Sequence, residues 1–186
     1  MRVLRKIYNK LRKIHYKLLS TNKNVVGIYK ICQPTCFCGG GKIILDKTQL
    51  GWQPSPYYYD GYIYLEARFS DSEINIGESL INNNLTVISE HGIIKVGNYC
   101  MIGTNVEIIN SDFHSIKPDE RNSGKHKSKN IIIGDNVWIG SNVKIMKGVH
   151  IGDGAIISNG SIVYDNVEEN TIVRGNPAIF YKKINL

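Results

Sequence analysis

The side chains best suited to acid–base chemistry in this sequence are its five histidines, because imidazole can accept or release a proton near neutral pH. They are His15, His91, His114, His126 and His150. Asp112 stands two residues before His114, and residues i and i+2 of an extended segment share a face, so Asp112 could orient that imidazole. Such a pair suits the removal of a proton from an attacking hydroxyl group.

The four cysteines carry a second kind of potential chemistry. Cys32, Cys36 and Cys38 form the pattern C-x3-C-x-C just before three glycines, and Cys100 stands alone. A zinc site would require a fourth ligand at a defined spacing, and the recurrent C-x2-C pair is missing. We therefore expect free thiols and no metal.

The composition is that of one globular domain, with 186 residues of which 42% are apolar. The net charge of +7 is uneven, because the first 45 residues contain ten Lys or Arg and no Asp or Glu, against 13 and 16 in the remainder. A basic segment can meet nucleic acid or an anionic membrane, but it is more often a solvated helix face, so we expect no nucleic-acid partner. The sequence has neither a membrane-spanning run nor a secretory leader pattern, and a cytoplasmic location is expected.

Residues 1–19 have the pattern of a basic amphipathic helix. Their apolar side chains recur at intervals of three and four residues, with Arg and Lys between them. These positions are Leu4, Ile7, Tyr8, Leu11, Ile14, His15, Leu18 and Leu19. We expect the helix to cap an exposed end of the fold that follows, and the alternative is peripheral contact with a membrane at its inner face.

From residue 133 onward the sequence repeats with a period of six. An aliphatic residue opens each unit, and a small or β-branched residue stands four positions later. The opening residues are Ile133, Ile139, Ile145, Ile151, Ile157 and Val163. Neither strand alternation nor helical spacing gives a strict six, so each hexad is expected to form one flat side of a three-sided coil.

This coil predicts an all-β solenoid, a parallel β-helix whose opening aliphatic residues point inward and stack between rungs about 4.8 Å apart. Gly, Asn and Asp serve the corners. We expect residues 1–41 to form the basic helix and a connecting segment, and residues 42–184 to form the β-helix domain. Residues 52–73 and the polar loop 111–131 break the period, and so long a loop in a regular solenoid is usually functional.

Three motifs make the chain resemble the hexapeptide-repeat O-acetyltransferases that act on maltose, galactosides, capsules or O-antigens. They are the run Ile133-Gly-Asp-Asn-Val-Trp-Ile-Gly-Ser, the segment Asp-Glu-Arg-Asn-Ser-Gly at 119–124, and Arg174-Gly-Asn-Pro-Ala. The likeness covers about residues 74–184. It implies a left-handed β-helix, a homotrimer, and acetyl-CoA as co-substrate.

The resemblance gives roles to residues on the acceptor side of a catalytic cleft. His114 matches a loop histidine that deprotonates the acceptor hydroxyl, and Asn82 resembles an asparagine that hydrogen-bonds the acceptor. Cys100 falls at an inward position of the repeat, so no covalent nucleophile is expected. The hydroxyl is therefore expected to attack acetyl-CoA directly, with a backbone N–H meeting the oxyanion. The other four histidines are expected to be structural or solvated.

The resemblance also implies a coenzyme groove between adjacent subunits. Trp138 should face outward and line the cleft near the acyl group, backbone groups of the last rungs should contact the coenzyme, and cations should meet its phosphates. The expected coenzyme contacts are Trp138, Gly140, Ser141, Asn159, Gly160, Arg174, Lys182 and Lys183. Tyr164-Asp165 departs from the Thr-Lys of many relatives and removes one phosphate partner.

These features predict acetyl transfer from acetyl-CoA to a sugar hydroxyl, with a bacterial surface polysaccharide or its precursor as the acceptor. The stretch Asn110-Ser-Asp-Phe-His-Ser-Ile most resembles polysaccharide-directed members of the family. The alternatives are a small free sugar, N-acetylation of an amino sugar, acetylation of an antibiotic, and a β-helix assembly module without activity. The intact His114 argues against the last.

Overall fold

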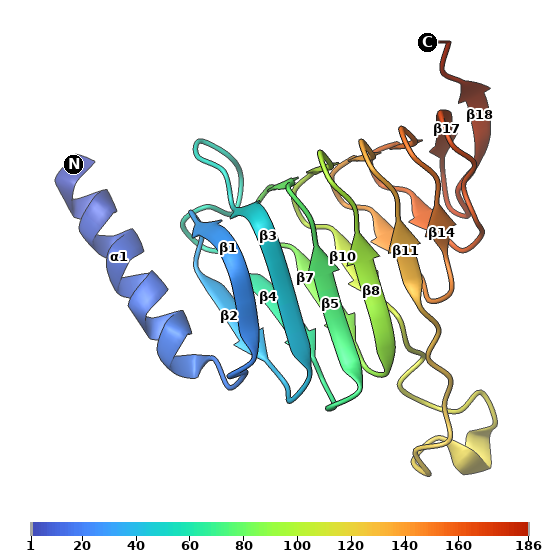
Figure 1. The fold of residues 1–186 in the computed structure, drawn as a ribbon, viewed down its shortest axis with the longest axis horizontal. Helices are drawn as coiled ribbons and strands as arrows, with labels where there is room; N and C mark the ends of the chain where they lie inside the picture. The colour runs from blue at the N-terminus through green and yellow to red at the C-terminus, as the bar shows by residue number, and fades with distance from the viewer. Residues whose placement is uncertain (1, 186) are drawn as a thin grey trace.

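The computed structural model describes residues 2–185 as a three-sided prism of stacked parallel strands with one helix at its N-terminal end (Figure 1). The first face contains β1 (Val25–Ile31), β3 (Lys42–Leu50), β5 (Ser72–Ile76), β8 (Gly92–Val96), β11 (Ile131–Ile133) and β14 (His150–Ile151). The second contains β6 (Leu80–Ile81), β9 (Met101–Ile102), β12 (Trp138–Ile139), β15 (Ile156–Ile157), β17 (Thr171–Arg174) and β18 (Ile179–Lys183). The third contains β2 (Thr35–Cys38), β4 (Ile63–Ala67), β7 (Thr86–Ser89), β10 (Glu107–Ile109), β13 (Lys144–Ile145) and β16 (Ile162–Val163).

The chain passes from the first face to the second, then to the third, and so completes each coil. Strand β3 belongs to two faces, because its first part pairs with β5 and its last two residues pair with β6. The pairs between coils are parallel, and only the terminal pair β17–β18 is antiparallel among the named strand pairs of the described chain. The predicted stacking of hexads into a parallel solenoid is confirmed.

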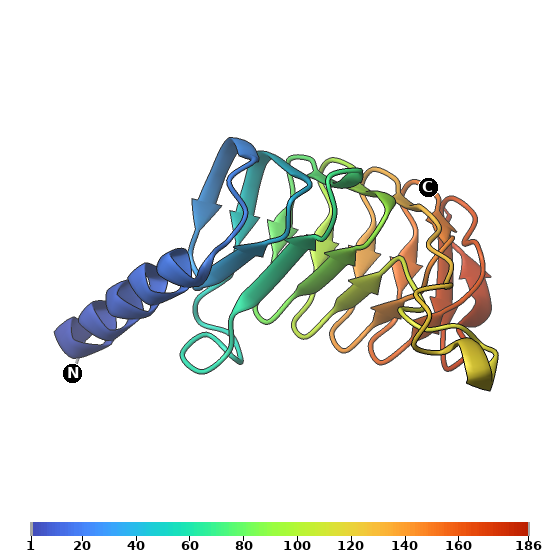
Figure 2. The same cartoon turned by 90° about the horizontal axis from the view of Figure 1, so that it is seen from below.

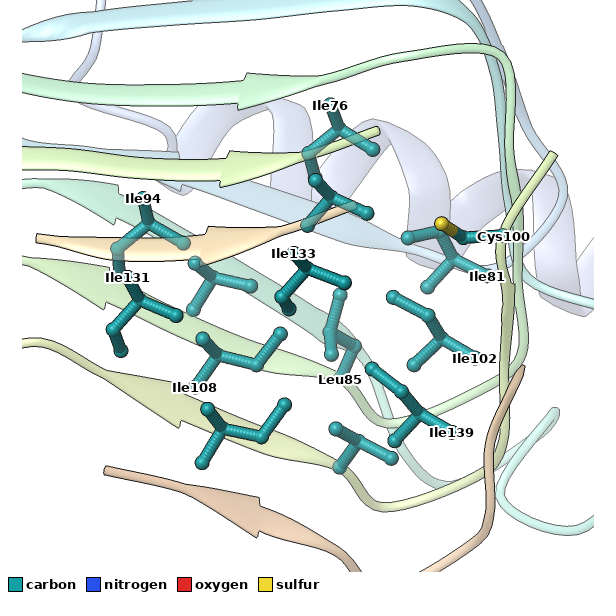
Figure 3. Close-up of a cluster of buried hydrophobic side chains, with 14 of the residues drawn as sticks. Ile76, Ile81, Leu85, Ile94, Cys100, Ile102, Ile108, Ile131, Ile133 and Ile139 are labelled. Atoms are coloured by element: carbon teal, nitrogen blue, oxygen red, sulfur yellow. The ribbon is translucent and has the colours of Figure 1, made fainter. Parts of the chain in front are cut away.

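The core is the column of side chains that open the hexads. Ile133 pairs in register with Val96, and Ile139 with Ile102, so that aliphatic side chains from successive coils stack directly along the prism axis (Figure 3). The side chains four positions later in each hexad also point inward, and Val137, Val143 and Val149 are buried. The sequence pattern thus identified both inward positions of each unit.

The strands begin earlier than the expected start of the β-helix at residue 42. Strands β1 and β2 pair with β3 and β4, so the described sheets start at Val25. This first coil lacks the six-residue phase, since β1 is seven residues long and pairs through a bulge between Ile28 and Tyr29. Residues 52–61 form a looped excursion before β4 resumes the prism.

Helix α1 (Arg2–Leu19) lies at the N-terminal end of the prism, but the face it packs on the prism is its polar face. The Asn9 amide donates to the Tyr58 hydroxyl at 2.9 Å, and the Lys13 ammonium donates to the carbonyl of Ile31 at 2.8 Å. The apolar stripe points away from the fold, with Leu11 60% and Leu18 80% exposed. The helix therefore does not use that stripe to cover the end of the core. No helix in the described part of the chain is both long and apolar enough to cross a bilayer.

Strand β11 offers a direct test of the inward column, because Ile133 is buried and its neighbour Ile132 faces outward. We predict that Ile133→Ala lowers the free energy of unfolding by about 2–5 kcal/mol, since it removes apolar surface that is buried on folding and leaves a cavity in the core. Ile132→Ala is the matched control and should cost about 1 kcal/mol or less. Urea unfolding followed by circular dichroism measures both, and equal losses would contradict the assignment of the core.

Candidate active site

The long loop leaves the prism at the corner between the third and first faces, which we call the loop corner (Figure 2). The chain exits after Ile109 and returns at Ile131, and a 3₁₀ turn at Pro118–Glu120 lies between. Its two legs are joined at the neck by an antiparallel bridge between Ser111 and Ser128. The loop is thus a closed projection fixed at its base.

His114 lies in this loop with an exposed side chain and one fixed ring nitrogen. Its Nδ1 atom is 3.0 Å from the carbonyl oxygen of Arg121. Because a carbonyl oxygen only accepts, Nδ1 must carry the hydrogen, and in the neutral ring Nε2 is then the free proton acceptor. His114 also lines a hollow of about 430 Å³, together with Ile116, Glu120 and Lys125. The geometry therefore presents a base beside a space that can hold part of a ligand.

Asp112 does not orient His114, contrary to the expectation from their spacing. Its carboxylate forms an ion pair with the Lys147 ammonium, which belongs to the coil on the C-terminal side. Lys147 also lies 3.4 Å from the carbonyl of Lys127, so one ammonium contacts both legs of the loop. The reason is the corner itself: Phe113 adopts a left-handed backbone with φ of 59°, which breaks the extended geometry that would put Asp112 and His114 on one face.

A buried acid clamps the loop from the coil on the N-terminal side. The side chain of Glu90 is only 4% exposed, and its carboxylate accepts from the Ser111 hydroxyl and lies 2.6 Å from Nε2 of His126. Arg68 completes the cluster, with one guanidinium nitrogen 3.2 Å from Glu90 and its charge over the ring of Phe113 at 4.6 Å. Both legs of the loop are therefore tied to Glu90, through Ser111 on one side and His126 on the other.

The charge on Glu90 is stabilised by this surrounding. Burial alone would raise the pKa of Glu90, but the hydrogen bond from Ser111 and the charges of His126 and Arg68 outweigh that effect, so its pKa lies below the ordinary value. The carboxylate thus stays ionised at neutral pH inside the neck of the loop.

Sequence reasoning missed this clamp. His126 was expected to be either structural or solvated, with no partner named, and it is 14% exposed and paired with Glu90. The available signal was the stretch Ser89-Glu-His-Gly92, where an acid falls at a break of the hexad phase. Its partners come from segments 22 and 36 residues away, and no local pattern connects them.

The second face carries an outward apolar column. Trp138 pairs with Met101 in one direction and with Ile156 in the other, and Ile156 pairs in turn with Ile172. Trp138 is 51% exposed, as expected for a side chain that ends a hexad. On the third face, by contrast, the outward pair at this level is the ion pair Lys144–Glu107. The second face is thus the one suited to an apolar ligand or another subunit.

Four expected coenzyme contacts gather at the corner that follows this face, which we call the glycine corner. Asn159 accepts the N–H of Ser141 at 2.8 Å, and the N–H of Gly160 donates to the carbonyl of Ser141 at 2.9 Å. A Cβ at Gly140 would lie 2.3 Å from the Asn159 side chain, so only glycine fits there. The N–H groups of Gly140, Ser141 and Gly160 all donate within the chain, so these three groups are not free to donate to a ligand.

The three expected phosphate-binding cations lie on the last two strands of the same face. Arg174 is 3.7 Å above the ring of Tyr181, and Lys182 is 5.8 Å from that ring, so the two cations share one aromatic support. Lys183 instead forms an ion pair with Glu168 at 3.0 Å. Arg174 and Lys182 are therefore the better placed pair for an anion.

The expected site residues fall into two groups on different parts of the prism. His114 and Asp112 lie at the loop corner, whereas Trp138 and the coenzyme residues lie on or beside the second face. Asn82 follows β6 and so belongs with the second group, at the glycine corner two coils before Gly140. Within one chain the structure does not bring His114 together with Asn82 or Trp138.

The thiols of Cys36 and Cys100 are not activated. Burial raises the pKa of Cys100 above its ordinary value, and burial together with the neighbouring Cys38 raises that of Cys36 to about 11. Both thiols are therefore protonated at neutral pH. Within residues 2–185, no three His, Cys, Asp or Glu side chains are grouped so as to hold a metal ion.

Comparison with known sequences identifies the six-residue repeat. Residues 130–165 match the family model "Bacterial transferase hexapeptide (six repeats)". A galactoside O-acetyltransferase from Lactococcus lactis subsp. lactis (strain IL1403) is 35% identical over 120 residues, which cover 64% of this chain and 57% of that protein. A Dictyostelium discoideum protein with a provisional acetyltransferase name is 40% identical over 111 residues, which cover 60% of this chain and 58% of that protein. The chain thus spans less than two thirds of the length of either relative.

The fold is also that of a solved structure. A hexapeptide-repeat-containing acetyltransferase from Vibrio cholerae O1 biovar eltor, complexed with acetyl coenzyme A, matches 98% of this chain and 84% of its own with a TM-score of 0.57 and 22% identity. The chain contains the bacterial transferase hexapeptide repeat, and its prism is a left-handed parallel β-helix. The predicted fold class and the family resemblance are confirmed.

The clamp at the loop corner leads to a prediction about Glu90. Replacing Glu90 with Gln should lower the free energy of unfolding by about 2 kcal/mol and speed tryptic cleavage between Lys117 and Lys127, because Arg68 and His126 lose a buried charged partner. Glu107→Gln, which breaks the exposed pair with Lys144, is the matched control and should cost about 0.5 kcal/mol or less.

The same variant has a defined pH dependence. Since the pKa of Glu90 is lowered by folding, its charge stabilises the fold fully above the unfolded carboxyl value of about 4.3, and that stabilisation is lost as the pH falls through the folded value. The difference between wild type and Glu90→Gln should therefore shrink on acidification below about pH 4. The measurement should extend to about pH 3. A stability difference that stays constant over this range would show that the ionised carboxylate of Glu90 does not cause it.

Proposed function

We propose that the protein transfers an acetyl group from acetyl-CoA to a hydroxyl group of a sugar, with His114 as the general base. The observation that carries the proposal is the hydrogen bond of His114 Nδ1 to a backbone carbonyl, which leaves Nε2 free to accept a proton. The matched hexapeptide repeat and the similarity to a galactoside O-acetyltransferase support acetyl transfer to a sugar. A surface polysaccharide or its precursor is the proposed acceptor, and a cytoplasmic location follows because acetyl-CoA is a cytoplasmic metabolite.

The proposed reaction is a single displacement. The acceptor hydroxyl gives its proton to Nε2 of His114 as its oxygen attacks the thioester carbonyl carbon, the carbon–sulfur bond then breaks, and the proton passes from the imidazolium to the leaving thiolate. The thiols of Cys36 and Cys100 play no part, because their raised pKa values keep them protonated. The products are the acetyl ester and free coenzyme A.

The second face and the glycine corner are proposed to hold the coenzyme. The amide N–H groups of a pantetheine arm can donate to carbonyl oxygens at Gly140, Asn159 and Gly160, while the exposed ring of Trp138 covers its apolar part. Arg174 and Lys182 are proposed to meet the phosphates. Lys183 contributes less than expected, because Glu168 already neutralises it.

A homotrimer is part of this proposal, because the two groups of site residues are separated within one chain. If the loop corner of one subunit meets the second face of the next, His114 approaches Trp138 and Asn82 across the interface. Such head-to-tail contacts close into a ring. The outward apolar column through Met101, Trp138 and Ile156 supplies surface that such a contact covers.

The role of His114 is tested by His114→Ala, measured as thiol release from acetyl-CoA with a panel of sugars and their amino analogues. We expect kcat to fall roughly 10² to 10⁴-fold while the KM for acetyl-CoA stays nearly unchanged. His150→Ala, an exposed histidine on β14, is the matched control and should keep wild-type turnover. Wild-type turnover by His114→Ala would remove it from the mechanism, and a preference for the amino analogues would reassign the acceptor as an amine.

The shared cleft is tested by mixing two inactive variants. The His114→Ala variant keeps an intact second face, and the Trp138→Glu variant keeps an intact loop. In trimers assembled from equal amounts of the two, roughly a quarter of the clefts receive an intact loop from one subunit and an intact second face from the next, so roughly a quarter of the wild-type rate should return. The control mixes the His114→Ala variant with a variant that carries both His114→Ala and Trp138→Glu, and this mixture should stay inactive. Absence of rescue in trimers shown to be mixed by sedimentation and mass spectrometry would place the whole site within one subunit.

A further inference from the structure

Helix α1 exposes an unbroken apolar stripe to solvent. The seven aliphatic side chains of the stripe are all exposed, at 48% to 80% of their full area. They are Val3, Leu4, Ile7, Leu11, Ile14, Leu18 and Leu19. The turns of one helix bring them together on one side, and Figure 2 shows the helix extending beyond the end of the prism with no other segment over it. A continuous patch of this kind marks an interaction surface.

The helix is held so that the stripe cannot turn inward. Arg12 donates to the carbonyl of Tyr58 at 3.2 Å, Tyr16 stacks on Tyr62 at 4.5 Å, and Asn9 is buried against Tyr58 and Cys32. These contacts all come from the polar side of α1. The exposed stripe is thus a consequence of specific polar contacts on the opposite side of the helix.

Positive charge surrounds the stripe. The first 45 residues contain ten Lys or Arg and no acid. Beside the helix, a hollow of about 470 Å³ opens between α1 and the first coil, with apolar walls that include Ile14, Tyr29 and Phe37. The lysines that line it are Lys10, Lys13, Lys17 and Lys23. No carboxylate side chain of residues 2–185 forms an ion pair with these four lysines. An apolar surface next to such ammonium groups matches a partner that is both apolar and anionic.

We propose that α1 docks this protein on an anionic phospholipid surface, with the aliphatic stripe in the boundary between headgroups and acyl chains and the lysines against the phosphates. A second copy of the chain is the less suitable occupant. The α1 helix of a second copy belongs to the same basic segment, whose first 45 residues contain no acid. Contact between two such helices would therefore place positive charges next to each other, and they would repel. The docking is independent of the reaction proposed above, and its measurement requires no acceptor.

The test uses the full-length protein and sucrose-loaded vesicles in a sedimentation assay. Wild type should bind vesicles of phosphatidylcholine with about a third phosphatidylglycerol, and bind pure phosphatidylcholine far more weakly. The triple variant Leu4→Gln, Leu11→Gln, Leu18→Gln should lower the partition coefficient by roughly tenfold or more, because it removes apolar area while glutamine keeps the helix propensity. Circular dichroism verifies that the helix remains.

Matched substitutions separate the stripe from general hydrophobicity. Gln at Ile93, Ile179 and Phe180, which are exposed elsewhere on the prism, should leave vesicle binding unchanged. Gln at Lys6, Lys10 and Lys17 should weaken binding to the anionic vesicles only. The proposal is overturned if wild type does not sediment with anionic vesicles, or if the leucine variant binds as wild type does. It is equally overturned if the leucine variant converts the wild-type oligomer into smaller species, because the stripe is then a contact between copies.

Discussion

The stacking of one aliphatic side chain in every six along the prism axis is the constraint on which the rest of this structure depends. Successive coils lie at the spacing of paired strands, so Ile133 meets Val96 and Ile139 meets Ile102 directly (Figure 3). Any change of phase would put a polar residue into the column. In the coils that keep this phase, an extra residue within a face would displace the inward side chains. Additional chain can leave only at a corner, and this is where the loop at residues 110–130 departs.

The outward positions are free of that constraint, and the three faces use this freedom differently. Third-face strands present a charged pair at Glu107 and Lys144, while second-face strands present Met101, Trp138 and Ile156. The same backbone thus supplies one face for solvent and one for an apolar partner. At the loop corner, an acid from the coil before and a lysine from the coil after hold the neck of the loop, which offsets the entropy of closing so long an insertion.

Much of the fold could be predicted from the sequence, because the information is local and repeated. The hexads from Ile133 onward indicate each inward position in turn, and the long polar segment indicates where the prism is interrupted. The first coil was not predicted, since β1 and β2 lack the phase and are recognised only by their pairing with β3 and β4. The orientation of α1 was also missed: the amphipathic pattern located its apolar stripe, but the contacts of Asn9 and Arg12 decide which side faces the prism.

The candidate site was predictable only in part for the same reason. His114 and Trp138 could be singled out by their positions in the loop and the hexad only together with the resemblance to hexapeptide-repeat O-acetyltransferases. The cluster of Glu90, Arg68 and His126 could not, because three segments far apart in sequence meet at one corner. Spacing likewise suggested Asp112 as the partner of His114, and a left-handed residue at Phe113 redirects it to Lys147.

The contact that fixes the ring of His114 has a consequence for how the loop can change over time. The acceptor of the Nδ1 hydrogen is a main-chain carbonyl, which every amino acid at position 121 would supply. Side chains around the imidazole can therefore be substituted during evolution, which changes the shape of the adjoining hollow, while the tautomer of the ring is kept. Systematic replacement of side chains would not detect this contact. Only a change in the path of the backbone, such as an insertion or deletion between residues 114 and 121, would remove it.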